Sequence, residues 1–162
     1  MKGTKRLATL SIAVALAMVL SFIESQIPAF VAIPGVKIGL ANIAVIFTLY
    51  KLGWKEAIAV SLVRVVLVAL LFGSFVSLLY SFAGAVLSLG VMLLLKPVKA
   101  IGKIGVSVSG GVCHNIGQII VASLIMETNV ILYYLPFLLL SGTIAGIAIG
   151  LASALLVERI KI

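Results

Sequence analysis

The sequence predicts an all-α integral membrane protein, in which residues 1–162 form a single domain of six membrane-spanning helices. Of the 162 residues, 64% are hydrophobic and only 10% are charged, and the mean hydropathy of +1.39 exceeds that of soluble domains. Six apolar segments have the length that a helix needs to cross a bilayer core of ~30 Å. The basic residues gather in alternate gaps between these segments, as membrane topology requires.

The spans follow from the apolar runs and from the charged or turn-forming residues between them. The first begins after Lys2, Lys5 and Arg6 and imitates a signal peptide. Its apolar run exceeds an h-region of ~7–15 residues and does not end in a small-residue cleavage site, so we expect a retained helix. The six spans are placed at residues 7–27, 36–52, 56–72, 75–95, 104–126 and 130–157.

The second and last spans are irregular. Span two is short, and Pro34-Gly35 before it predicts an irregular entry. A five-span alternative fuses spans two and three, but the sequence at residues 53–56 (GWKE) is typical of a charged turn at the membrane interface. The last span is long, and Pro136 marks either a kink or the true start of the helix.

Small residues indicate which helices approach closely, because backbones touch only where side chains are short. Gly142, Gly146 and Gly150 recur at helical spacing in span six, and we interpret them as intramolecular packing. Ala13 and Ala17 in span one allow the same interpretation or a contact with a partner protein. Further small residues lie in spans four and five: Ser77, Ser81, Gly84, Ser88, Gly110 and Gly111.

The placement of lysine and arginine predicts the orientation. With the N-terminus inside, all basic residues except Lys37 and Arg64 face the cytoplasm, and both termini are cytoplasmic. Lys37 falls outside, and Arg64 lies within span three. The net charge of +8 is thus explained by topology, and we expect contact with the lipid bilayer but not with nucleic acid.

The strongest candidate for a binding site lies in span five. On a helix of 3.6 residues per turn, Ser107, Gly111, His114 and Gln118 share one face, with Asn115 at its edge. Polar groups at mid-depth are costly unless partnered, and they usually face a bundle interior or a cavity. They either hydrogen-bond neighbouring helices or line a ligand site, and we favour the site.

Arg64 is the most costly residue of the predicted spans. It lies well away from both ends of span three and cannot shed its charge, so it needs a carboxylate, carbonyls, water or a ligand anion. Glu24, toward the outer end of span one, is the obvious carboxylate partner. A structural Arg64–Glu24 pair and an anion-binding arginine are equal alternatives, and both residues are candidate site residues.

The first outer loop, residues 28–37, is apolar and contains two prolines that stiffen it. Such a loop either closes over a pocket as a lid or lies in the headgroup region. Lys37 in this loop and Asn42 just inside span two are candidate site residues. Tyr80 in span four either lines the same pocket or sits at the membrane interface.

No catalytic arrangement emerges from the sequence. Aspartate is absent, so no aspartate-rich cluster can hold magnesium and diphosphate, and there is no GxxxxGK[ST] loop to cradle ATP phosphates. The single cysteine, Cys113, cannot form an internal disulfide, and no Cys/His cluster indicates a metal site. His114 has no visible nucleophile beside it, although proton relay stays open to it. We expect neither an enzyme nor a cofactor.

Several blocks of the sequence are quite specific when taken together. They are residues 34–42 (PGVKIGLAN), Arg64, residues 71–73 (LFG), 79–84 (LYSFAG), 114–118 (HNIGQ) and 133–136 (YYLP). In these blocks, over nearly the whole chain, the sequence resembles the Gx transporter family. Members of that family are integral membrane proteins that are also labelled heptaprenyl diphosphate synthase component I.

That family in turn resembles the substrate-binding S components of energy-coupling factor (ECF) transporters. The resemblance implies a six-helix protein of a prokaryotic cytoplasmic membrane that binds a vitamin-like small solute from outside under a mobile first loop. It also implies a transmembrane coupling protein and two ATPase subunits as partners, contacted partly through small residues of span one, which Ala13 and Ala17 match. The second hypothesis is a membrane accessory component of heptaprenyl diphosphate synthase, in quinone-linked prenyl metabolism.

Overall fold

The chain folds almost entirely into α-helices. A computed structural model describes residues 3–26 and 39–160, and these residues contain no β-strand. Six α-helices follow one another in the predicted order, which confirms the six-helix, all-α class within these ranges. The elements are α1 (Gly3–Gln26), α2 (Asn42–Lys51), α3 (Trp54–Phe72), α4 (Phe75–Leu95), α5 (Lys103–Ile125), the short 3-10 helix η1 (Val130–Tyr134) and α6 (Leu135–Arg159).

Four helical segments of the described chain are long and apolar enough to cross a membrane, namely α1, α4, α5 and η1 together with α6. Their length and composition indicate a multi-pass membrane protein. The helix α3 has 19 residues but carries Lys55, Glu56 and Arg64. That all six helices cross the membrane therefore stays a prediction.

The helix α2 corrects the boundaries expected for span two. It has ten residues, so it measures about 15 Å, half of a ~30 Å bilayer core. Residues 39–41 form a turn in which the Asn42 N–H donates to the Gly39 carbonyl over 2.8 Å. Residues 36–38 of the expected span lie outside the described residues. A helix of this length is typical of a buried core helix or a broken span.

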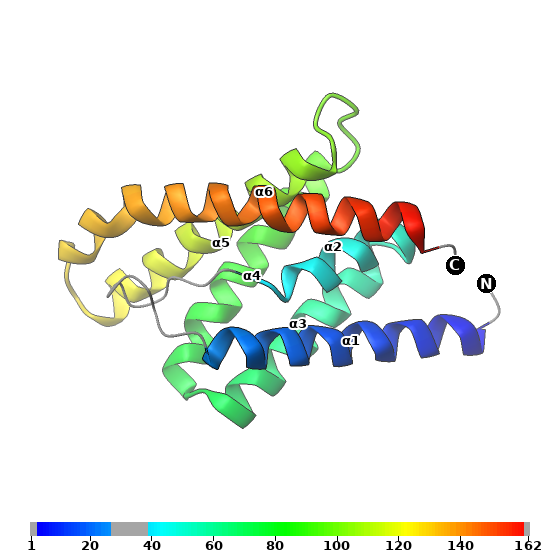
Figure 1. Cartoon of the computed structure of the whole chain (residues 1–162). Coiled ribbons are helices and arrows are strands. Elements are labelled where there is room, and N and C mark those ends of the chain that lie inside the picture. Colours follow the sequence, from blue (N-terminus) through cyan, green and yellow to red (C-terminus); the bar gives the residue numbers. More distant parts are fainter. Residues whose placement is uncertain (1–2, 27–38, 161–162) are drawn as a thin grey trace.

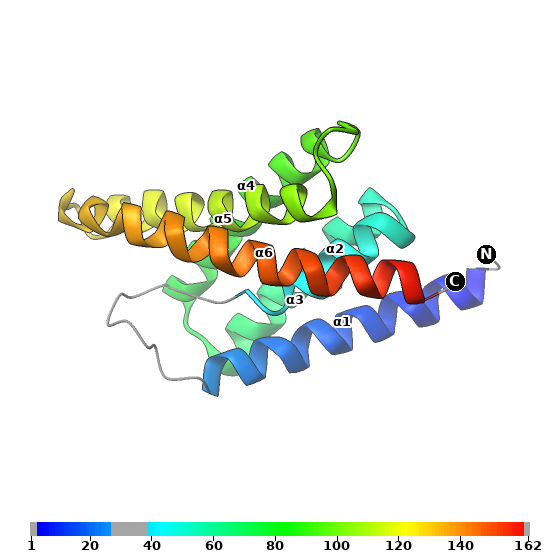
Figure 2. The same ribbon diagram turned by 45° about the horizontal axis from the view of Figure 1, so that its top comes forward.

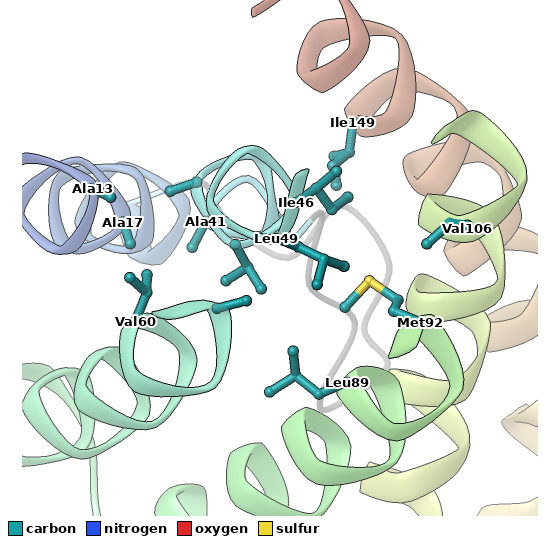
Figure 3. Close-up of a cluster of buried hydrophobic side chains, with 13 residues drawn as sticks. Ala13, Ala17, Ala41, Ile46, Leu49, Val60, Leu89, Met92, Val106 and Ile149 are labelled. Carbon is teal, nitrogen blue, oxygen red and sulfur yellow. The ribbon is translucent and has the colours of Figure 1, made fainter. Parts of the chain in front are cut away.

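The core of the bundle is built around α2. The helix is buried along most of its length because α1, α3 and α6 all contact it. Alanines of α1 approach it from one side, Val60 of α3 from below, and Met92 of α4 and Ile149 of α6 from the other side (Figure 3). Five residues of α2 are buried: Ala44, Val45, Ile46, Thr48 and Leu49.

The three C-terminal helices form the most extensive contacts, with α5 packed against both α4 and α6. Figure 1 shows the start of α1 and the end of α6 at one end of the bundle, and the turn between α5 and α6 at the other. The turned view in Figure 2 agrees. Both helix ends therefore lie on one side, as the predicted topology requires, while their cytoplasmic orientation stays a prediction.

Charged side chains form ion pairs and a hydrogen bond between helices at the end of the bundle where α1 begins. Arg6 of α1 pairs with Glu56 of α3. Lys103 of α5 pairs with Glu158 of α6 over 2.9 Å. Lys96, at the end of α4, donates to the Leu49 carbonyl in the last turn of α2 over 2.7 Å. A last-turn carbonyl has no partner within its own helix, so the lysine both satisfies it and complements the negative helix end.

The connections bear on two alternatives that the sequence leaves open. Gly53, with a φ of 132°, separates α2 from α3, so the two are distinct helices, while the number of membrane spans stays a prediction. A residue with a side chain disfavours that backbone conformation, which explains a glycine at this turn. Pro136 lies in the first turn of α6 and therefore marks the true start of the helix rather than a kink.

Candidate functional site

A small cavity lies where the beginning of α2 meets α5 and α6. Its volume is about 20 Å³, enough for about one water molecule. Three polar side chains line it, one from α2 and two from α5: Asn42, Ser107 and His114. The remaining lining residues are small or apolar: Gly39, Gly111, Gly142, Ala145, Gly146 and Ile149.

Glycines form the wall of this cavity because α5 and α6 touch backbone to backbone. A Cβ atom on Gly111 would lie 2.7 Å from the Gly142 carbonyl oxygen, and one on Gly146 would lie 2.6 Å from the Val108 Cα. Real Cβ atoms do not approach so closely, so the contact requires glycine at both positions. The glycine spacing that the sequence shows in span six therefore serves intramolecular packing.

The imidazole of His114 packs against Gly84 of α4. A Cβ atom on Gly84 would lie 2.8 Å from His114 Cε1 and equally close to the His114 carbonyl oxygen. The ring is thus wedged between the backbone of α4 and the cavity. Close packing of this kind fixes the orientation of a polar group before any ligand arrives.

The hydroxyl group of Ser107 is a buried polar group within the cavity. The residue is 3% exposed, and its Oγ has no hydrogen-bond partner among the described residues. Ser109, on the same helix, instead donates to the Gly105 carbonyl over 2.9 Å. A buried hydroxyl without a partner costs free energy that a ligand or water can recover.

Asn115 is not among the described residues that line the cavity, and its side chain bonds α6 instead. Its Nδ2 donates to the Leu138 carbonyl of α6 over 2.7 Å, and both residues are buried. A Cβ atom on Gly142 would lie 2.8 Å from that nitrogen, so glycine leaves room for the amide. Of the two interpretations of this face, the hydrogen bond between helices therefore describes Asn115.

The other candidates on α4 and α5 lie apart from the cavity lining. Gln118 is 7% exposed, and its Oε1 has no partner among the described residues. Neither Gln118 nor the half-buried Tyr80 is among the described residues that line the cavity. Lys37 lies outside the described residues.

Arg64 and Glu24 form a second polar group, adjacent to the cavity rather than in it. The Glu24 carboxylate interacts electrostatically with Arg64 and accepts a hydrogen bond from the Gly39 N–H. Arg64 Nε is buried without a partner among the described residues. Because Gly39 itself lines the cavity, the carboxylate lies one peptide group away from it.

Ala13 and Ala17 are buried within the chain. They are 5% and 0% exposed and pack into the core beside α2 (Figure 3). Their short side chains let α1 approach α2, so they serve packing within the chain. A contact with a partner protein through these two residues stays a prediction.

Sequence reasoning left several functional contacts unseen. The hydrogen bond from Gly39 to Glu24 joins residues that are distant in sequence, and no periodicity indicates it. Ala145 and Ile149 enter the cavity wall from α6 without a chemical signal. Ser107 was on the predicted polar face of span five, and the spacing to His114 was the signal that could have made it a site residue.

The comparisons with known proteins identify a family. Residues 13–156 match the family model described as heptaprenyl diphosphate synthase component I. No curated protein and no solved structure matches the chain. The match covers most of the 162 residues and includes every residue that lines the cavity. The chain therefore belongs to the heptaprenyl diphosphate synthase component I family.

Proposed function

We propose that this chain is the solute-binding membrane subunit of a transporter for a small, vitamin-like solute, similar to the S component of an ECF transporter. One observation carries the proposal: Asn42, Ser107 and His114 converge on one cavity within a membrane bundle. Polar groups inside a membrane are costly, and in transporters they mark the solute path.

The shortness of α2 supports the same conclusion. Transporters place solute sites where a membrane helix is interrupted, because irregular backbone is tolerated there only beside protein or a wet cavity. Here the turn at residues 39–41 precedes α2, and Gly39 and Asn42 both line the cavity. In sequence this turn directly follows the predicted first outer loop, and the proposed solute enters the cavity from that outer side.

Energy for transport would come from other subunits, since the sequence has no phosphate-binding loop of its own. A transmembrane coupling protein with two ATPase subunits is the proposed partner set, in a prokaryotic cytoplasmic membrane. Because Ala13 and Ala17 are buried, such a partner would contact the exposed face of α1, which includes Ile12 and Leu16.

Native mass spectrometry of the protein purified from its own membrane tests this proposal. We expect a small molecule to be retained by the wild type and lost from Asn42→Ala and His114→Ala. Asn129→Ala is the matched control, because Asn129 lies in the exposed turn before η1. Equal retention by all variants would contradict the proposed site.

The second candidate is a membrane accessory component of heptaprenyl diphosphate synthase, which the family description favours. In that case a soluble prenyl synthase would copurify with this chain, and the length of the product that the synthase makes would change on binding. Copurification with a coupling protein and ATPases would support the transporter instead.

A further inference from the structure

The residues around the cavity carry polarity without formal charge. None of the nine described residues that line it is an acid, a lysine or an arginine. Their polar atoms belong to an amide, a hydroxyl and an imidazole, groups that both donate and accept hydrogen bonds when neutral. A charged group of a solute would find no carboxylate, ammonium or guanidinium group among them.

Among the described residues, two opposite charges lie beside the cavity, at Glu24 and Arg64. The N-terminus of α2 is a site of partial positive charge that favours an anion. Glu24 supplies that anion, since its carboxylate accepts the Gly39 N–H just before the helix. The same carboxylate faces Arg64. Among the described residues, Glu24 is thus both the acceptor at the turn before α2 and the carboxylate that interacts with Arg64, so an anionic solute there would compete with it.

The shape of the cavity restricts what can enter. Its wall is formed largely by the backbones of Gly39, Gly111, Gly142 and Gly146, which offer a surface without side chains. The volume of about 20 Å³ admits only a small part of a molecule. The hydroxyl of Ser107, buried and without a partner among the described residues, is positioned to bond that part.

From these observations we infer that the cavity binds an uncharged hydrogen-bonding edge of the solute, such as the carbonyl and N–H of an amide or of a flat ring. This inference rests on the proposed function and adds the chemical class of the solute. Asn42 and Ser107 bind this edge of the solute. Glu24 instead accepts the hydrogen bond from Gly39 in the cavity wall and interacts with Arg64, and neither charged residue contacts the solute.

Benzamide and benzoate test the inference, because they differ chiefly in the charge of one small polar edge. Thermal stabilisation of the full chain in lipid nanodiscs is measured against the concentration of each probe. We expect benzamide to bind at least about tenfold more tightly, because a carboxylate would be buried there without a compensating charge. Equal binding, or preference for benzoate, overturns the inference.

Two serine variants on one helix locate the contact. Ser107→Ala should weaken benzamide binding about three- to tenfold, the loss expected for one hydrogen bond between neutral groups. Ser109→Ala is the matched control, because that hydroxyl bonds its own helix at Gly105. An equal loss in both variants overturns the assignment. If Ser107→Ala does not fold, the comparison of the two probes on the wild type still decides.

The solute retained from the native membrane separates this inference from the proposed function. A neutral molecule that Ser107→Ala releases supports both. A retained anion, particularly one that Lys37→Met releases, is compatible with the proposed transporter function but contradicts the inference that the cavity binds an uncharged edge of the solute. Retention of no molecule, together with no stabilisation by either probe, counts against both.

Discussion

The two halves of this bundle are held together by different means. In α4–α6 the closest approaches involve the backbone, as where Gly84 lies against the carbonyl and ring of His114 and Gly146 lies against Val108. In α1–α3 they are made by side chains and by charge, as where Glu24 faces Arg64 and Arg6 pairs with Glu56. Backbone contacts have no freedom to adjust, whereas side chains can repack. The C-terminal half is therefore suited to hold the cavity in one shape.

The largest expected effect breaks a backbone contact of the C-terminal half. Gly146→Ala places a Cβ atom 2.6 Å from the Val108 Cα, where no flexible side chain can yield. We expect the free energy of unfolding to fall by about 1–3 kcal/mol, the range for overpacking a tight core. Thermal unfolding of the purified protein in detergent, followed by circular dichroism, measures the change.

Gly90→Ala is the matched control for this prediction. Gly90 lies within α4, and an added Cβ atom would meet nothing within 4 Å. Alanine there should raise the free energy of unfolding by roughly 0.5–1 kcal/mol, because it favours the helix. If the two substitutions had the same effect, close backbone contact would not distinguish the C-terminal half.

The next effect concerns the charged contact of the N-terminal half. Glu24→Ala removes the acceptor of the Gly39 N–H and leaves Arg64 without its carboxylate, and we expect a loss of about 1–3 kcal/mol of stability. Glu24→Gln keeps an acceptor and should lose less. A double-mutant cycle with Arg64→Met should show a coupling of at least about 0.5 kcal/mol. Additive losses would mean that the two residues act separately.

A smaller effect tests the role that the structure gives to Asn115. Asn115→Ala removes the hydrogen bond to the Leu138 carbonyl, and such bonds between membrane helices contribute roughly 0.6–1.7 kcal/mol. Stability should fall by that amount while benzamide binding stays unchanged. If the variant kept its stability but no longer bound benzamide, Asn115 would belong to the binding site.

The sequence predicts well what depends on local periodicity. Ser107, Gly111 and His114 were placed on one helical face, and all three line the same cavity. The helix order and the start of α6 at Pro136 also follow from apolar runs and turn residues. These features depend on positions close together in the chain, so the helical repeat is sufficient to find them.

The remaining features depend on how helices face one another, which one sequence does not encode locally. Ala13 and Ala17 lie on one stripe of α1, but lipid and core are both apolar, so the pattern does not reveal which stripe faces inward. Glu24 interacts electrostatically with Arg64, and whether Arg64 also binds a ligand anion stays a prediction. Their place beside the cavity rather than within it depends on how α1 and α3 lie relative to Gly39, which hydropathy cannot give.

The smallest expected effect compares one ion pair from each half. Glu56 of the pair with Arg6 has a side chain that is 14% exposed, whereas Glu158 of the pair with Lys103 is 68% exposed. Water solvates an exposed carboxylate almost as well as a lysine does, so Lys103→Ala should cost only a few tenths of a kcal/mol, near the lower end of the usual ~0.2–1 kcal/mol. Arg6→Ala should cost more, up to about 1 kcal/mol, because Glu56 Oε2 is already buried without a partner among the described residues. Thermal unfolding at low and high salt measures both, and equal costs would show that burial of the carboxylate does not separate the two halves.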